Sequence, residues 1–368
     1  MVPRSRIKSE SFGAHTEWDL LKEVVVGRIE GAVVSDEPLP MIQATMPQKY
    51  WEFFQKNAGK PFPQAQIDAA NKDLETFVHI LEAEGVKVRR PDLPGNLFSK
   101  PIETAHWKTK GGFYAAMPRD KFLLIGNKII EAPMSWRSRR NESIPYQTLM
   151  KEYESRGAEW IIPSLPQMTE KDYTAGWRYS EDQFQSVITE EEPIFEAADF
   201  IRLGKDILAL QSHVTNRKGI EWLEKFLGDA YHVHVIDVPN AHRMHIDTTL
   251  TLLKPGLLLA NPVWVPPSVV AKLKKGILKH WDIVPAPQPV IPDSHPLYMT
   301  SKWVSMNVIM IDTERVFVET HDEPLFKLMR NLGLKPIRCP FRNFNTFGGS
   351  FHCATIDVWR EGSLKSYL

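Results

Sequence analysis

The sequence is poor in cysteine and has no long apolar run. Its 368 residues include only two cysteines, Cys339 and Cys353, and one disulfide is too little to hold a secreted scaffold together. We therefore expect two free thiols and a cytoplasmic protein. No apolar run approaches the roughly 18 to 20 residues that a membrane span needs, and residues 1–6 lead into polar sequence without a signal-peptide pattern.

An excess of one charge is also missing, because 45 basic residues balance 45 acidic ones. A chain without net charge has no long-range field that attracts nucleic acid or an anionic membrane, so neither is an expected partner. The chain also lacks GxGxxG and GxxxxGK[ST] for nucleotides, HExxH and CxxC for metals, and GxSxG for serine hydrolysis. We expect no cofactor and no metal, although four histidines fall within residues 232–245.

What the sequence does contain is one pattern repeated five times: an amphipathic helix followed by a short β-rich run that ends at a proline. The copies lie at residues 80–91, 151–163, 224–239, 275–285 and 326–340. In four copies a glycine ends the helix, as expected where a helix leads into a strand: Gly85, Gly157, Gly228 and Gly333.

Hairpin-like pairs of apolar runs precede several of these helices, at residues 200–210, 248–260 and 304–319. Each unit is therefore predicted to be strand, strand, helix, strand. Such a unit cannot bury its own apolar faces, so we predict that five of them pack around a common axis as one domain over residues 1–368. Length alone would also allow two or three domains.

The two ends of the chain are predicted to complete one unit between them and to close the ring, through residues 17–27 and 353–360. Two stretches do not fit the repeat and are predicted insertions, at about residues 35–70 and 163–194. Loops of this length often carry function, and they also serve as plain covering segments.

Cys353 is the first candidate for chemistry, because it follows the run GGSFH directly before an expected strand, where a thiol can be exposed. Cys339 lies in an apolar run and suits a buried thiol better. His245 and Asp247 are two residues apart in an extended run and would point to the same side. Asp199 stands just before an expected strand, and Asp120 stands at a turn. Taken singly, each acid is equally typical of a cap or turn.

Eight longer motifs, in the same order, make the chain resemble the arginine amidinotransferases. This family includes arginine:glycine amidinotransferase and the inosamine-phosphate and cyanobacterial-toxin enzymes. The motifs lie at residues 17–27, 115–120, 126–139, 195–207, 212–223, 244–250, 296–308 and 348–358.

The resemblance implies an α/β fold of the guanidine-modifying superfamily, a five-bladed α/β propeller of ββαβ units with pseudo-fivefold symmetry. It implies that Cys353 is the nucleophile, His245 the general acid and base, and Asp199 the carboxylate paired with this histidine. It further implies that Asp120 and Asp247 grip the donor guanidinium. Four more residues would line the site: Tyr114, Met244, Thr300 and Ser301.

One position departs from the family. Where glycine-type members carry an arginine that binds the donor carboxylate, this chain has Trp264, and tryptophan cannot pair with a carboxylate. Either arginine is held another way, for example through Arg243, or the donor is a decarboxylated or altered guanidine, or Trp264 merely packs.

The reaction predicted first is transfer of the amidino group of L-arginine to a primary amine through an amidino-cysteine intermediate, in a natural-product pathway, with ornithine released. The partners would then be small molecules, and a homodimer is compatible with the family. A hydrolase of the arginine deiminase type would instead form citrulline, since water attacking the same intermediate gives that product. A catalytically silent propeller used for binding is the third reading.

Overall fold

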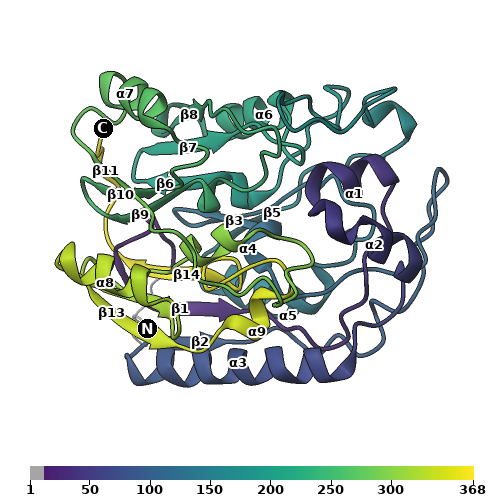
Figure 1. The fold of residues 1–368 in the computed structure, drawn as a ribbon, viewed down its shortest axis with the longest axis horizontal. Coiled ribbons are helices and arrows are strands. Elements are labelled where there is room, and N and C mark those ends of the chain that lie inside the picture. Colours follow the sequence, from purple (N-terminus) through teal and green to yellow (C-terminus); the bar gives the residue numbers. More distant parts are fainter. Residues whose placement is uncertain (1–11) are drawn as a thin grey trace, which may run out of the picture.

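Residues 12–368 form five separate small β-sheets with helices around them (Figure 1). The structure is a computed structural model and describes residues 12–368. Residues 1–6, on which the signal-peptide argument rests, lie outside this range. Within the described residues four sheets have three strands and one has two, so this part of the chain is an α/β structure built from five similar units.

The strands of each sheet are neighbours in the chain except in the first sheet. The first sheet joins β1 (Leu20–Val26), β2 (Lys87–Arg89) and β14 (Thr355–Glu361), and the second β3 (Phe122–Ile125), β4 (Lys128–Glu131) and β5 (Glu159–Ile161). The third contains β6 (Phe200–Leu203), β7 (Asp206–Leu210) and β8 (His232–Ile236), and the fourth β9 (Leu250–Lys254), β10 (Leu257–Ala260) and β11 (Asp282–Pro285). The fifth pairs β12 (Arg315–Glu319) with β13 (Lys335–Cys339).

All five predicted helix–strand pairs are confirmed. The helices are α3 (Gln64–Ala83), α5 (Gln147–Ser155), α6 (Arg217–Leu227), α7 (Pro267–Lys275) and α8 (Glu323–Asn331), and each leads into an edge strand of a sheet. That strand runs parallel to its neighbour in every sheet. The four predicted helix-ending glycines have φ between 63° and 102°, the region where a side chain is strained.

The two ends of the chain do form one unit between them. β1 pairs antiparallel with β14, from Leu20 opposite Glu361 to Val26 opposite Thr355, and parallel with β2. This pairing places the residues just before β14, including Cys353, in the middle of the molecule.

The predicted hairpin at residues 304–319 is wrong in its first strand. A 3-10 helix, η7 (Lys302–Met306), occupies this place, and only one isolated bridge links Met310 to Val316. The Ser301 hydroxyl caps the turn by accepting from the backbone N–H of Trp303. The segment then continues to Asn307, whose side chain is hydrogen-bonded in the centre of the molecule and not along a sheet edge.

The two predicted insertions contain little β-structure. The first folds as α1 (Leu39–Thr45), η1 (Gln48–Tyr50) and α2 (Trp51–Asn57) before α3 begins, and the second is an extended loop with one turn, η3 (Glu170–Asp172). The remaining short helices are α4 (Pro118–Lys121), η2 (Ile144–Tyr146), η4 (Ala197–Asp199), η5 (Gly228–Ala230), η6 (Ile246–Thr248) and α9 (Arg342–Asn345).

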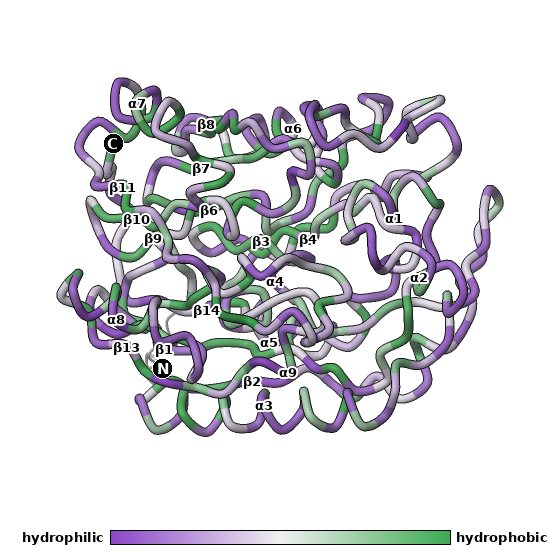
Figure 2. Tube along the Cα trace, viewed as in Figure 1, coloured by the Kyte–Doolittle hydropathy of each residue, from purple (hydrophilic) through white to green (hydrophobic). Residues whose placement is uncertain are grey.

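Burial falls from the inner strands to the outer ones. Every residue of β3, β6, β7 and β10 is buried, whereas β8, β11 and β13 each begin with an exposed residue. Of these, β3 and β10 are apolar throughout, whereas β6 contains Arg202 and β7 begins with Asp206. Hydrophobic colour gathers inside the trace in Figure 2. Over residues 12–368, no helix is both long and apolar enough to cross a membrane.

Candidate active site

The candidate residues come from equivalent places in different units, namely the short segments that lead into the antiparallel edge strand of a sheet. Asp120 is in α4 before β3, Asp199 in η4 before β6, and Asp247 in η6 before β9. Cys353 lies just before β14. The turns α4, η4, η6 and η7 contact one another in sequence around the centre. A repeated unit therefore delivers one polar side chain per turn to a common point.

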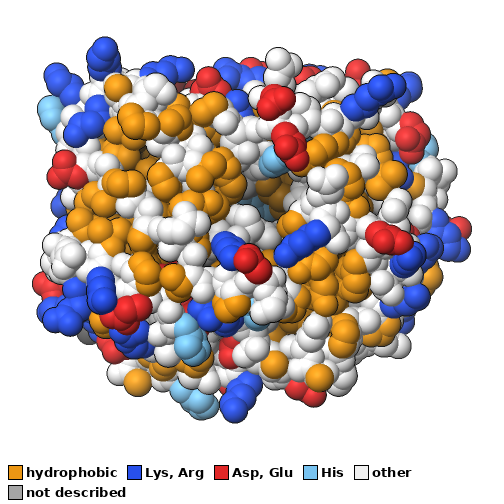
Figure 3. All heavy atoms as spheres, in the orientation of Figure 1, with side chains coloured by type: hydrophobic (Ala, Val, Ile, Leu, Met, Phe, Trp, Pro, Cys, Tyr) orange, Lys and Arg blue, Asp and Glu red, His pale blue; other side chains and the backbone are white. Residues whose placement is uncertain are grey.

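A cavity of about 270 Å³ opens at this point. Figure 3 shows a hollow near the middle of this face, with histidine at its floor and apolar side chains around it. Both predicted insertions reach it, the first through Thr45 and Gln48 and the second through Tyr179. The cavity wall contains most of the predicted site residues: Tyr114, Asp120, Met244, His245, Trp264, Thr300, Ser301 and Cys353.

Three predicted residues are not in the cavity wall. Asp247 and Asp199 are buried immediately behind it. Arg243 is turned away: its guanidinium pairs with Asp237 at 3.1 Å and stacks on Phe184. The structure therefore does not bring Arg243 to the place where it would bind a donor carboxylate.

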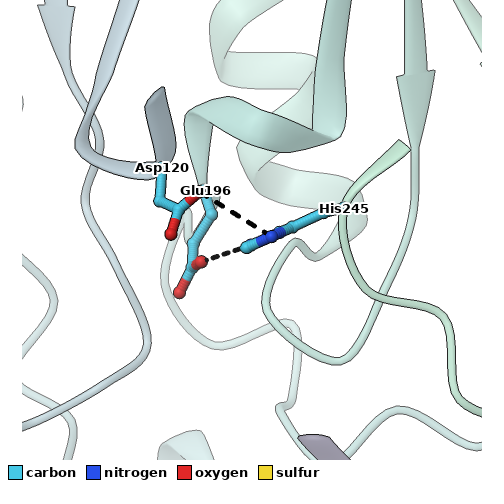
Figure 4. Close-up of side chains that lie close together, drawn as sticks. All are labelled: Asp120, Glu196 and His245. Carbon is cyan, nitrogen blue, oxygen red and sulfur yellow. Dashed lines mark hydrogen bonds and ion pairs between the residues drawn. The ribbon is translucent and has the colours of Figure 1, made fainter. Parts of the chain in front are cut away.

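The imidazole of His245 faces two carboxylates, which Figure 4 shows next to each other on the same side of the ring. Its Nε2 is 2.7 Å from Glu196 Oε2, and its Nδ1 is 3.7 Å from Asp120 Oδ1. The predicted partner, Asp199, is not hydrogen-bonded to it. The Asp199 Oδ2 atom instead accepts from the hydroxyls of Ser212 and Thr215 at 2.6 Å each. The pairing prediction is corrected to Glu196, whose longer side chain reaches the imidazole from the residue before η4.

The backbone of His245 is held in an unusual conformation, with φ 59° and ψ 113°. Among residues 12–368 only Met168 and His245 have a positive φ without being glycine. The Cβ of a residue other than glycine makes this region costly, by about 1 to 3 kcal/mol. Such strain is typical of sites where a side chain must be aimed at a ligand.

Cys353 is fixed from its other side by Asn307. The amide Oδ1 of Asn307 accepts from the backbone N–H of Cys353 at 2.9 Å, and its Nδ2 donates to Asp247 Oδ2 at 2.7 Å. The Cys353 Sγ lies 3.7 Å from the same Asp247 oxygen. The thiol, Asp247 and the cavity therefore share one rigid arrangement.

Four buried carboxylates around the cavity follow one rule. In each, one oxygen is engaged by a fixed partner: Arg139 for Asp120, His245 for Glu196, Ser212 and Thr215 for Asp199, and Asn307 and His352 for Asp247. Among residues 12–368, the other oxygen of each is buried without a hydrogen-bond partner: Asp120 Oδ1, Glu196 Oε1, Asp199 Oδ1 and Asp247 Oδ1. Buried carboxylate oxygens are costly when unpaired, so this set is suited to a cation that is not part of the chain.

The pKa values of these groups reflect an incomplete charge balance. Burial raises the pKa of Asp199 to about 7 and raises that of Asp120 as well. Burial alone would lower the pKa of His245, but the carboxylates of Asp120, Glu196 and Asp199 outweigh it and raise the value to about 10. Burial, together with Asp247 and Asp120, raises the pKa of the Cys353 thiol well above its usual range.

One oxygen each from Asp120 and Glu196 and one nitrogen of His245 lie within 4.8 Å of one another, close enough to share a metal ion. Arg139 already occupies the same carboxylates, at 3.0 Å from Asp120 and 3.3 Å from Glu196. A guanidinium and an imidazolium supply the positive charge that a metal would bring. We therefore interpret this group as an ion-pair cluster.

Four residues with clear roles in this geometry were missed by the sequence reasoning: Glu196, Arg139, Asn307 and His352. All four lie inside motifs that carry the resemblance, at residues 195–207, 126–139, 296–308 and 348–358. Their signal was therefore present. Nothing in the spacing indicated which polar residue of a motif would point inward.

No protein-family model matches the sequence, but individual proteins do. The chain is 50% identical over 364 residues to the L-arginine:L-lysine amidinotransferase of Pseudomonas savastanoi pv. phaseolicola, covering 98% of both chains. A solved structure, the amidinotransferase SxtG of the saxitoxin biosynthetic pathway from Microseira wollei, matches with a TM-score of 0.90 and 44% identity, covering 97% of this chain and 99% of that one. DDAH from Pseudomonas aeruginosa covers 92% of this chain at 14% identity and a TM-score of 0.54, a likeness of fold alone.

Proposed function

This chain belongs to the amidinotransferase family, and from that premise we propose that it transfers the amidino group of L-arginine to a primary amine and releases ornithine. We further propose that the five sheets are the blades of one α/β propeller and that residues 1–368 form a single catalytic domain. The named role of one relative in a toxin pathway favours natural-product biosynthesis.

The observation that carries this proposal is the set of four buried carboxylate oxygens without a hydrogen-bond partner, around the cavity that contains Cys353 and His245. A guanidinium is flat, permanently charged and able to donate several hydrogen bonds in fixed directions. Asp120 and Asp247 supply acceptors for it from two different turns. Binding it would pair oxygens whose burial is otherwise unfavourable.

In the first half-reaction the Cys353 thiol loses its proton to solvent as the donor cation binds, because a bound guanidinium offsets the charges of Asp120 and Asp247. The thiolate attacks the guanidinium carbon and forms a carbon–sulfur bond. His245, held as an imidazolium by Glu196 and Asp120, donates its proton to the departing nitrogen. The carbon–nitrogen bond breaks, ornithine leaves, and an amidino group remains on the sulfur.

In the second half-reaction the acceptor amine takes the place of ornithine. Neutral His245 removes a proton from this amine, which attacks the amidino carbon while the carbon–sulfur bond breaks. The products are a new guanidine, a Cys353 thiolate and a His245 imidazolium. The two substrates therefore use the site in turn, and the kinetics are expected to be ping-pong.

The cavity lining includes several neutral polar groups among its apolar ones, namely Gln48, Asn240, Thr300 and Ser301. We propose that hydroxyl and amide donors there hold the arginine carboxylate, since Trp264 replaces the family's arginine and Arg243 is turned away. Ser301→Ala should then raise KM for L-arginine more than KM for its decarboxylated analogue, measured by ornithine or diamine release. An equal rise for both donors would contradict this assignment.

Incubating the protein with L-arginine and a panel of amines tests the function itself. L-Lysine is the first acceptor to try, because the relative that is 50% identical is named for it. Ornithine should form only when an acceptor is present, and Cys353→Ala should lower its rate roughly 10⁴-fold or more. Citrulline formed without any amine would instead support the hydrolase alternative.

A further inference from the structure

His352, the residue before the proposed nucleophile, has a carboxylate on each ring nitrogen. Its Nδ1 is 2.8 Å from Asp247 Oδ2, and its Nε2 is 3.3 Å from Glu17 Oε2. The side chain is buried, as are both acids. Glu17 comes from the segment before β1, so this histidine joins the cavity to the N-terminal part of the described chain.

This geometry determines the protonation state of the imidazole. An ionised carboxylate can only accept hydrogen bonds, and a neutral imidazole has one N–H and one bare nitrogen. Although burial opposes ionisation, arginine and histidine partners hold the pKa of Glu17 well below its usual range and histidine partners lower that of Asp247. Both ring nitrogens must therefore carry protons, and His352 is an imidazolium.

The charge of His352 acts on the same Asp247 oxygen that lies 3.7 Å from the Cys353 sulfur. A carboxylate at that distance opposes formation of a thiolate. The charged groups that face Cys353 are Asp247, Asp120 and Arg119, and those that face His352 are Asp247, Glu17 and Arg119. Since Arg119 is committed to Asp357 in a close ion pair, His352 is the cation that neutralises Asp247 directly.

We propose that His352 is a positioning residue for the amidino transfer: as an imidazolium it holds Asp247 with one oxygen turned toward the donor, and it offsets the repulsion between Asp247 and the Cys353 thiolate. This role rests on the proposed function in naming Asp247 as a donor ligand. The electrostatic part concerns only groups within the chain and has its own readout.

Two variants separate charge from shape. His352→Asn places an amide nitrogen near the position of Nδ1 and retains a donor for Asp247, whereas His352→Gln retains one for Glu17. Both remove the positive charge. The rate of Cys353 alkylation by iodoacetamide is measured as a function of pH by site-resolved mass spectrometry. In both variants this pH profile should move to higher pH by about one unit or more, so that the reaction at neutral pH is roughly tenfold slower.

The matched control is His234→Asn, which removes a histidine that also lies 2.8 Å from a buried aspartate, Asp206, but outside the cavity wall. Its alkylation profile should match that of the wild type. A folded His352→Asn or His352→Gln protein with an unshifted profile would overturn the proposal. Failure of the wild type to release ornithine with any amine would overturn the proposed function and would leave the alkylation result standing.

Discussion

Two buried clusters of charge lie next to each other in this protein, and they differ in how completely they are paired. The cavity carboxylates, Asp120, Glu196, Asp199 and Asp247, each keep one oxygen without a hydrogen-bond partner. The closed ion cluster beneath them consists of Glu17 and Asp357 with three arginines, Arg119, Arg202 and Arg360. Both clusters use the same residue types at the same depth.

In the closed ion cluster every carboxylate oxygen is engaged. Asp357 Oδ1 accepts from Arg119, and its Oδ2 from Arg202 and Arg360; Glu17 accepts from Arg202 with both oxygens. Although burial opposes ionisation, these arginines lower the pKa of both acids, whereas burial raises the pKa of Asp120 and Asp199. Complete pairing marks a cluster that holds the fold together, and incomplete pairing marks one that is completed by a ligand.

The largest expected effect is on stability, from breaking the closed cluster. Asp357→Asn removes the shared partner of three buried arginines, and uncompensated buried charge costs about 3 to 5 kcal/mol. Chemical denaturation should show a loss of this size in the free energy of unfolding. A loss below about 1 kcal/mol would mean that the cluster is not a structural element.

The next effect is on activity and should leave stability almost unchanged. Asp120→Asn removes one arm of the proposed guanidinium clamp, so kcat/KM for L-arginine should fall roughly 100-fold or more. The free energy of unfolding should stay within about 1 kcal/mol of the wild-type value or increase. The reason is that burial disfavours the charged form of Asp120 and raises its pKa.

Glu159→Gln, at an acid that pairs with Lys128 on the surface, is the control and should alter neither quantity. If Asp120→Asn unfolded the protein as readily as Asp357→Asn, the distinction between the two clusters would be lost.

The sequence predicted the units better than it predicted the contacts. Helix periodicity, glycine stops and terminal prolines located all five helix–strand pairs, because those signals depend only on neighbouring residues. The failed hairpin at residues 304–319 shows the limit: its apolar pattern favours a strand, but the side chain of Asn307 is committed to Asp247 and Cys353. A distant partner decided the conformation there.

The same limit applies to the site. Cys353 and His245 could be selected from residue type and motif, and both line the cavity. The partner of His245 could not be chosen between Glu196 and Asp199, since both lie in one motif and only the turn η4 decides which of them faces the imidazole. Glu17 and His352 are more than 300 residues apart in the chain, so no spacing rule links them.

A smaller effect should appear when the cavity carboxylates bind a cation. Cys353→Ala cannot react, so binding can be measured alone. L-Arginine at one hundred times its dissociation constant should add about 2.7 kcal/mol to the free energy of unfolding, seen as a higher thermal midpoint. L-Citrulline has the same shape with a neutral head group and should stabilise much less. Equal stabilisation by both would show that charge at the four unpaired oxygens does not drive binding.

The smallest effect concerns protons, and it follows from the raised pKa of Asp199. A carboxyl whose pKa is raised from 3.8 to about 7 favours the folded state below pH 3.8, and this contribution is lost as the pH rises through 7. Without a donor the protein should therefore lose stability between pH 3.8 and pH 7, while His245, with a pKa of about 10, keeps its proton.

A bound guanidinium lowers the carboxyl pKa again. Calorimetry of Cys353→Ala at pH 7 in two buffers of different ionisation heat should therefore detect release of up to about one proton with L-arginine and none with L-citrulline. The closed ion cluster cannot contribute to this signal, because its acids are already ionised. Proton uptake in place of release would mean that the cavity carboxylates are charged and balanced before the donor arrives, and the contrast between the two clusters would then have to be explained by something other than a missing cation.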